Sequence, residues 1–110
     1  MTDFNSRLGL SPAADGSVTL DAGPDHEIAP GVVHFAVLAT LAEVSAARAV
    51  GAPVVPASIS LNLLSPAKPG RLVGRGRLLR RGKRLAVAEG EVTQGDTLVA
   101  KAVVTFALTA

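Results

Sequence analysis

The chain has 110 residues, of which 48% are hydrophobic and 18% charged, so its length and composition predict one ordered domain, spanning residues 1–110, around a single core. The formal net charge is only +2, and aromatic residues make up 3% of the chain, so we expect Val, Leu, Ile and Ala to build that core. The absence of cysteine excludes disulfides, thiol chemistry and thiolate zinc sites, and the N-terminal MTDFNSRLGL lacks the apolar run of a secretory signal, which makes the cytoplasm the default location.

The first 30 residues predict one short strand between irregular segments. Residues 1–10 favour a short amphipathic turn, and residues 11–16 predict a loop because proline and glycine interrupt them. Ser17–Leu20 predicts a short strand, since Val18 and Leu20 alternate with polar neighbours. Residues 22–30 contain two prolines and a glycine, so we expect an irregular loop that ends in a Pro30-Gly31 turn.

The dominant element is a predicted helix of about 18 residues that follows Val32 and stops at Gly51 and Pro53. A helix that is apolar nearly all round is buried on most sides. Glu43 and Arg48 lie inside this segment and argue against a membrane span. We therefore expect this helix to be central and wrapped by a sheet.

Four strands are predicted after the helix. Apolar residues alternate with polar ones over residues 54–64, which is the period of a half-buried strand. Residues 71–80, 84–93 and 97–108 are expected to be the next three strands. The last of them places these residues on one side: Leu98, Ala100, Ala102, Val104, Phe106 and Leu108. Residues 65–70, 81–83 and 94–96 predict the connecting turns. Such short connections make neighbouring strands antiparallel. The expected fold class is therefore α+β, with an antiparallel sheet wrapped around one long helix.

Glu43 is the first candidate for chemistry. Positions three or four residues away along a helix share its face, and here they are mostly small: Ala36, Ala39, Thr40, Ala46 and Ala47. A carboxylate in such a setting is poorly solvated, which raises its pKa and suits acid–base or nucleophilic work. Arg48 is five residues on, outside the spacing for an intrahelical ion pair. The alternatives are that Glu43 lies at the helix edge or pairs with an arginine from a strand.

The order of elements and the residues PGVVHFAVLATLAE resemble the hotdog-fold acyl-CoA thioesterases of the PaaI-like and 4-hydroxybenzoyl-CoA type. In that family a Gly-x-x-His-Gly-Gly turn opens the central helix, and an Asp or Glu follows nine residues after the His. Gly31 and His34 match the turn, and Glu43 stands at the acidic position. The resemblance extends over residues 8–108 and includes the turn LSPAKPG. It departs at Phe35 and Ala36, which replace the two glycines, and at the loop DHEIAPG, which lacks the family's Asn.

The resemblance implies hydrolysis of an acyl-CoA thioester at a site between two subunits of a homodimer or homotetramer, without a cofactor. Glu43 is implied as the general base or the nucleophile, and the backbone N–H of Phe35 as the donor to the thioester oxygen. A helix N-terminus suits a developing oxyanion. His34 could polarise the substrate carbonyl or hydrogen-bond its own backbone. The alternative is a weakly active or non-catalytic acyl-CoA-binding protein, in which Phe35 closes the acyl pocket.

Several other residues are candidates for substrate contact. Guanidinium groups bind phosphates with paired hydrogen bonds. The basic residues of the second predicted strand after the helix and of the hairpin that follows it are therefore candidates for the CoA phosphates: Arg71, Arg75, Arg77, Arg80, Arg81, Lys83 and Arg84. Gly31 is a further candidate, and so are Asn62 and Ser65, although polar residues on the open face of a strand need no substrate role. The alternative for the basic cluster is a solvated hairpin, while the scarcity of aromatics and the mild net charge disfavour nucleic acid. No membrane partner is expected, and His26, Glu27, His34 and Glu43 do not follow a metal-ligand spacing, so no metal is expected.

Overall fold

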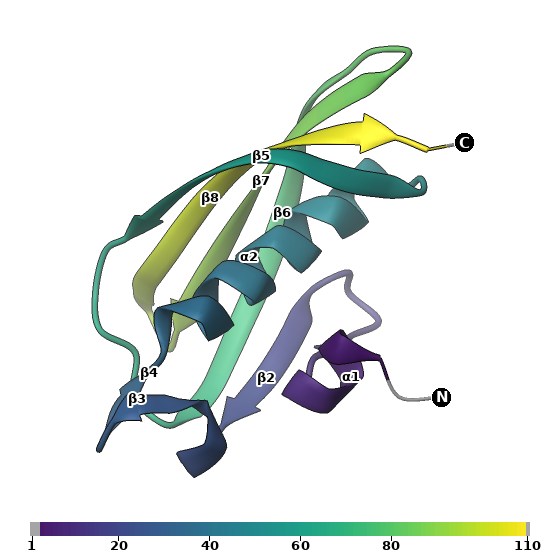
Figure 1. Cartoon of the computed structure of the whole chain (residues 1–110). Helices are drawn as coiled ribbons and strands as arrows, with labels where there is room; N and C mark the ends of the chain where they lie inside the picture. The colour runs from purple at the N-terminus through teal and green to yellow at the C-terminus, as the bar shows by residue number, and fades with distance from the viewer. Residues whose placement is uncertain (1–2, 110) are drawn as a thin grey trace.

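A computed structural model describes residues 3–109, in which an antiparallel sheet curls around one long helix (Figure 1). Six strands form the sheet in the order β1-β2-β6-β7-β8-β5, and β3 pairs with β4 in a small separate sheet. The elements are α1 (Phe4–Leu8), β1 (Ser11–Pro12), β2 (Val18–Ala22), the 3-10 turn η1 (Pro24–His26), β3 (Glu27–Ala29), β4 (Val32–Val33), α2 (Phe35–Val50), β5 (Val54–Leu63), β6 (Gly70–Arg81), β7 (Leu85–Gln94) and β8 (Thr97–Leu108). The predicted α+β class, the central helix and the four long strands are confirmed.

The short elements before α2 correct the sequence prediction. Residues 11–16 were expected to be a loop, but Ser11 and Pro12 pair with β2 as an edge strand. The predicted irregular segment 22–30 contains η1 and β3, because Gly31, with φ of +80°, reverses the chain so that β3 and β4 can pair. The helix begins at Phe35 and has 16 residues rather than about 18, because Val33 belongs to β4 and His34 is the N-cap, with an extended backbone.

Three glycines let α2 approach the sheet closely. A Cβ at Gly90 would meet the Ala42 carbonyl, and one at Gly76 would lie 2.6 Å from the carbonyl carbon of Ser45. A Cβ at Gly74 would collide with the Ser45 hydroxyl. The glycines of β6 and β7 therefore fix where the middle of α2 lies, including the turn that carries Glu43.

The core lies between α2 and the inward faces of the sheet. The predicted inner face of β8 is confirmed over Ala100, Ala102, Val104 and Phe106, all fully buried. At the start of β8 a register irregularity in its pairing with β7 buries Val99, and Leu98 is only half-buried. The core consists of Val, Leu, Ala and Phe106; the expected contribution of isoleucine is wrong, since both isoleucines are exposed.

Strand β5 differs most from the prediction. It was expected to be half-buried, but Ile59 is 47% and Leu63 is 52% exposed, and only Leu61 on that face is partly covered. The reason is its position at the end of the sheet, where it pairs with β8 alone. A ten-residue edge strand with exposed apolar side chains is a surface that proteins normally protect.

Candidate functional site

The start of α2 is held by a dense set of backbone contacts. The Nδ1 atom of His34 accepts a hydrogen bond from the Ala36 N–H at 2.9 Å, and the His34 N–H donates to the His26 carbonyl at 2.8 Å. His34 therefore makes the backbone contact that was the structural alternative to a catalytic role. The predicted substrate contact Gly31 forms the turn before it, and its N–H donates to Glu27 Oε2 at 2.7 Å. Within residues 3–109 the Phe35 N–H has no acceptor, so a free donor remains at the helix start.

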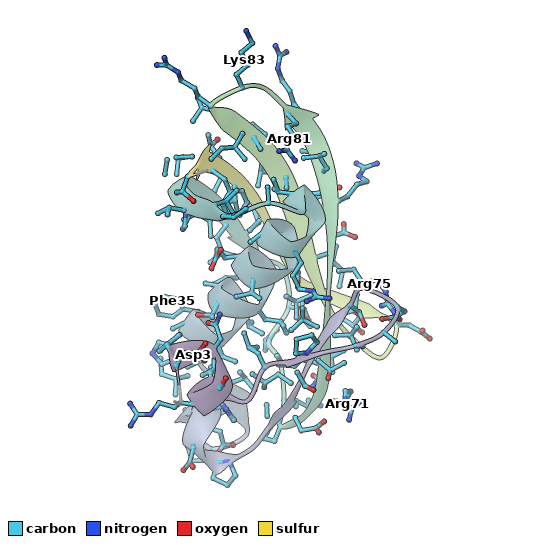
Figure 2. The ribbon with its side chains drawn as sticks, turned by 90° about the vertical axis from the view of Figure 1, so that its right-hand side faces the viewer. Asp3, Phe35, Arg71, Arg75, Arg81 and Lys83 are labelled. Carbon is cyan, nitrogen blue, oxygen red and sulfur yellow. The ribbon has the colours of Figure 1, made fainter. Side chains whose placement is uncertain are left out.

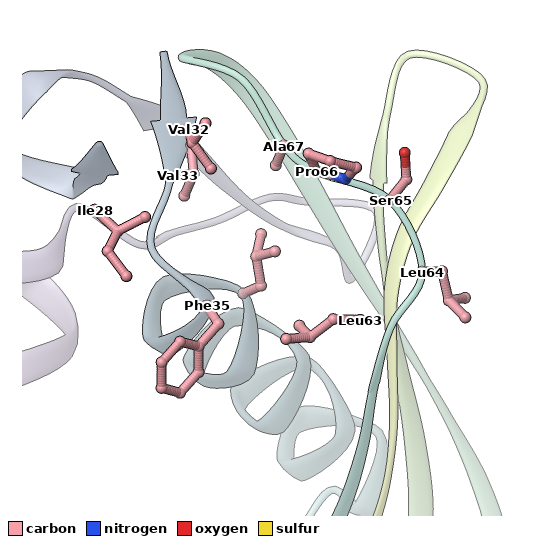
Figure 3. A pocket seen from close by; sticks show the side chains of 10 residues that line it. Ile28, Val32, Val33, Phe35, Leu63, Leu64, Ser65, Pro66 and Ala67 are labelled. Carbon is pink, nitrogen blue, oxygen red and sulfur yellow. The ribbon is translucent and has the colours of Figure 1, made fainter. Parts of the chain in front are cut away.

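A groove of about 350 Å³ opens beside this helix start. Figure 3 shows the side chains of Ile28, Val32 and Phe35 on one side of it, and those of the β5–β6 connection on the other. Ser65 is its one hydroxyl residue, and the complete lining is Ile28, Val32, Val33, Phe35, Leu38, Leu63, Leu64, Ser65, Pro66 and Ala67. The Phe35 ring is 52% exposed and lies against the His34 ring, with the two centroids 4.6 Å apart. The groove suits an apolar group, and its lining residues were not identified from sequence apart from Phe35 and Ser65.

Glu43 lies farther along α2, in a different cavity. Its side chain is half-buried, and this burial raises the pKa of Glu43 above its ordinary value. Among the described residues Glu43 has no ion-pair partner, so the alternative of an arginine partner from a strand does not describe it. Its half-buried side chain is consistent with the other alternative, a position at the helix edge. Its cavity, of about 520 Å³, is lined by Asn5, Glu43, Val44, Ala47, Arg48, Gly51, Ala52, Val54 and Pro56.

The environment of Glu43 is partly the predicted one. Ala36, Ala39, Thr40 and Ala47 are exposed or half-buried, but Ala46 is fully buried against the sheet. Phe35 and Glu43 are eight residues apart, or about 12 Å along the helix axis. The free amide and the carboxylate of one chain therefore do not meet at one substrate carbonyl.

The basic residues of the β6–β7 hairpin lie at the opposite end of α2 from Phe35, as the positions of Arg81 and Lys83 in Figure 2 show. Arg81 donates from Nη1 to the Val50 carbonyl at 3.2 Å, which stabilises the C-terminus of α2. Arg80, Lys83 and Arg84 are exposed and line none of the cavities described above. The structure does not bring this predicted phosphate-binding cluster close to the groove.

Asn62 also lies away from both cavities. It pairs in register with Lys101, while Leu61 and Leu63 on either side of it point toward the helix. The outer face around Lys101 carries an ion-pair network, in which Glu89 contacts Arg77 at 2.9 Å and Lys101 at 3.4 Å. Asn62 is therefore exposed on the sheet face opposite α2.

His26 has a larger structural role than the loop position assigned to it. Its Nδ1 accepts from the Gly23 N–H at 3.0 Å, and its Nε2 contacts the Leu8 carbonyl at 2.7 Å. It thereby joins the end of α1 to the segment that leads into α2. Within the part of the chain that the structure describes, no group of three or more His, Asp or Glu side chains is arranged to hold a metal ion, and neither α1 nor α2 is a candidate membrane span.

Comparisons with known proteins identify the family. The family model of the acyl-CoA thioesterase N-terminal domain matches residues 24–107. A search of curated proteins finds no match. Among solved structures, a conserved protein from Pseudomonas aeruginosa is 28% identical, with 99% of this chain and 95% of that chain covered and a TM-score of 0.88.

Two further structures carry the name of phenylacetic acid degradation. A protein related to that process from Ralstonia eutropha is 29% identical, with 94% and 88% of the two chains covered and a TM-score of 0.84. A mutant of the phenylacetic acid degradation protein PaaI from Thermus thermophilus is 27% identical, with 96% and 98% covered and a TM-score of 0.86. The resemblance seen in the sequence is thus confirmed, and the chain belongs to the hotdog-fold acyl-CoA thioesterase family.

Proposed function

We propose that the protein hydrolyses an acyl-CoA thioester at a site shared by two copies of the chain. Membership in the acyl-CoA thioesterase family supports the reaction class. The observation that carries the residue assignment is Glu43, a half-buried carboxylate with a raised pKa and no ion-pair partner within residues 3–109, on the central helix of this fold. Such a group can accept a proton near neutral pH more readily than a solvated glutamate.

The second functional group is the Phe35 N–H, which donates no hydrogen bond to any acceptor in the described part of the chain. Because about 12 Å of helix separates it from Glu43, we assign the two groups of one site to different subunits. Glu43 of one chain acts with the Phe35 amide of the partner subunit. The positive end of the helix dipole adds to the stabilisation of negative charge there.

In the proposed reaction, Glu43 takes a proton from a water molecule as its oxygen attacks the thioester carbonyl. The carbonyl oxygen becomes an oxyanion that the Phe35 N–H stabilises. The tetrahedral intermediate then collapses, the C–S bond breaks, and the proton held by Glu43 passes to the leaving CoA thiolate. The alternative is direct attack by Glu43, through an anhydride that water then hydrolyses, and it uses the same two groups.

The apolar groove beside Phe35 is the proposed acyl site. Its lining is apolar apart from Ser65, which suits an acyl chain or an unsubstituted ring better than a charged group. The Phe35 side chain, which stands where the family has glycine, reduces the space near the carbonyl. This feature also favours the second candidate function, a weakly active or non-catalytic acyl-CoA-binding protein.

The exposed edge of β5 is the proposed contact between subunits. Ten residues of this strand have a free edge, and Val55, Ile59 and Leu63 expose apolar side chains along it. Antiparallel pairing of two β5 strands across a two-fold axis would satisfy the free backbone groups and cover these side chains. A homodimer is therefore the smallest assembly of the proposal, and a homotetramer would contain two of them.

A free-thiol assay against a panel of acyl-CoAs tests the proposal. We expect Glu43→Ala and Glu43→Gln to lower kcat by about a hundredfold or more, while Glu91→Gln, a matched change on the outer face of the sheet, leaves kcat within about twofold. Turnover by the Glu43 variants at the wild-type rate would remove Glu43 from the chemistry. Binding of acyl-CoA without turnover by the wild-type protein would favour the second candidate.

The amide donor can be tested by substitution because Phe35 is the first residue of α2. Proline is tolerated at this position, and His34 already has the extended backbone, with ψ of 139°, that a following proline requires. Phe35→Pro removes the N–H, whereas Phe35→Ala retains it. We expect Phe35→Pro to lower kcat by about a hundredfold to a thousandfold relative to Phe35→Ala.

A further inference from the structure

We propose that the outer face of the β6–β7 hairpin binds the surface of a membrane that contains anionic phospholipids. This surface, called the hairpin patch, consists of residues from the end of β6, the turn and the start of β7: Leu79, Arg80, Lys83, Arg84, Leu85 and Val87. Figure 1 shows the hairpin projecting beyond the rest of the sheet, and in Figure 2 Lys83 lies at its tip. The hairpin patch does not depend on thioester hydrolysis, because it lines neither the groove beside Phe35 nor the cavity of Glu43.

The apolar residues that β7 contributes to the hairpin patch face away from α2. Val87 stands between Ala86 and Ala88, which are both buried in the core. Because side chains alternate between the two faces of a strand, Val87 and Leu85 lie on the face opposite α2. Val87 is half-buried there, whereas Leu85 is 52% exposed.

A β-bulge in β6 adds a second leucine to this surface. The register of β6 with β7 shifts between Leu78 and Arg80, so that Leu79 is an extra residue. Leu79 and Arg80 therefore both stand opposite Val87. The Leu79 side chain is 44% exposed. Exposed leucines beside basic side chains are the composition that binds at a membrane–water interface.

The charge around these leucines is positive. Arg80, Lys83 and Arg84 are exposed, and within residues 3–109 their side chains make no hydrogen bond and no ion pair. The sequence has no Asp or Glu from residue 44 to residue 88. Glu89, the next acid along β7, is already bound by two basic side chains, at 2.9 Å and 3.4 Å. The three cations can therefore bind an anionic surface without breaking an existing contact.

An anionic bilayer fits this combination better than another polyanion does. Each Lys or Arg near a membrane surface strengthens binding to anionic headgroups by about fivefold. The leucines gain from leaving water for the boundary between headgroups and acyl chains. A single-stranded nucleic acid would use the cations but also aromatic side chains for stacking, and the hairpin patch has none. No membrane partner is expected from the sequence, and the difference comes from the exposure of Leu79 and Leu85, which only the fold shows.

Co-sedimentation of the whole protein with vesicles tests the hairpin patch. One set of vesicles contains phosphatidylserine and phosphatidylcholine in equal amounts, and the other contains phosphatidylcholine alone. We expect the protein to bind the anionic vesicles at least about tenfold more strongly than the neutral ones, and to bind them less well as ionic strength rises from about 0.1 M to about 1 M.

Two sets of substitutions separate the charges from the leucines. Arg80→Gln/Lys83→Gln/Arg84→Gln should weaken binding to the anionic vesicles by about a hundredfold. Leu79→Ser/Leu85→Ser should weaken it by about tenfold and leave the dependence on ionic strength unchanged. Both sets lie at exposed positions, and either can be interpreted if the other does not fold, which circular dichroism will show.

The matched control for the charge variant is Arg7→Gln/Lys68→Gln/Arg71→Gln. It removes the same net charge from exposed positions on α1, on the β5–β6 connection and at the start of β6, all outside the hairpin. We expect it to bind the anionic vesicles within about threefold of wild type, because distant exposed charges are largely screened.

Four outcomes would overturn the hairpin patch: equal binding to the two kinds of vesicle, equal losses for the charge variant and its control, wild-type binding by the leucine variant, or retention on DNA without binding to either vesicle. The last outcome would assign the cations to nucleic acid. None of these measurements needs turnover. A protein that binds the anionic vesicles as expected but hydrolyses no acyl-CoA would refute the proposed function and leave the hairpin patch standing.

Discussion

Replacing Gly90 with alanine tests whether α2 is placed by the glycines of the sheet. The new Cβ would collide with the Ala42 carbonyl oxygen and lie 2.8 Å from its carbon and 3.1 Å from the Ala42 Cα, where ordinary contacts begin at 3.4 Å. These atoms are helix backbone, so no side-chain rotation can relieve the overlap. Overpacking of a core costs about 1–3 kcal/mol, and a backbone collision belongs at the upper end of that range. We therefore expect Gly90→Ala to lose about 3 kcal/mol of unfolding free energy.

Urea unfolding followed by circular dichroism measures this loss, with all proteins at one concentration because assembly also affects stability. Gly23→Ala is the matched control, since a Cβ there meets nothing within 4 Å and the residue does not have a positive φ. We expect Gly23→Ala to stay within about 0.5 kcal/mol of wild type. Equal stability of Gly90→Ala and Gly23→Ala would refute the close approach of α2 to β7.

Three further predictions follow from single side chains. Burial raises the pKa of Glu43 above its usual 4.5. As pH rises past that value, the unfolded chain releases a proton that the folded chain keeps, so the free energy of unfolding falls. Glu43→Gln should therefore have a higher free energy of unfolding than wild type at about pH 7 but not below about pH 4, and the same difference between the two proteins at both pH values would contradict this. His34→Ala removes the acceptor for the Ala36 N–H and should lower the free energy of unfolding in urea by about 1 kcal/mol. His34→Asn retains an acceptor and should lower it less. Equal losses for the two variants would argue against a capping role of the His34 side chain at the start of α2. Ile59→Lys places a charge on the free β5 edge and should shift the assembly toward monomer in light scattering, and an unchanged mass would reject β5 as the subunit contact.

The sequence predicted the long elements well because each repeats one clear pattern. The helical run ending at Gly51 and the alternation over residues 97–108 each extend over several turns or pairs, so local exceptions do not hide them. The short strands β1, β3 and β4 have only two or three residues and are defined by their partners, which no local pattern indicates. Strand β5 has the alternation of a half-buried strand, but its exposure depends on what covers the sheet edge.

For the candidate site, the sequence identified residues more readily than their surroundings. The His34–Glu43 spacing indicated the family and the acid, and the structure adds that Glu43 is half-buried without an ion-pair partner among the described residues. The hairpin arginines were predicted as a phosphate site because they are adjacent in sequence, but Arg81 and Lys83 lie at the opposite end of α2 from Phe35. Most groove residues were missed because they come from β3, β4, α2, the end of β5 and the β5–β6 connection, which only the fold brings together.

The shared site is tested most directly by mixing two inactive variants, Glu43→Ala and Phe35→Pro, after unfolding and refolding them together in equal amounts. If each site takes Glu43 from one chain and the amide from its partner, every mixed dimer has one intact site, and about a quarter of wild-type activity should return. If both groups act within one chain, no mixed dimer has an intact site. Activity no greater than the sum of the separate variants, from a mixture that light scattering shows to be dimeric, would contradict the shared site.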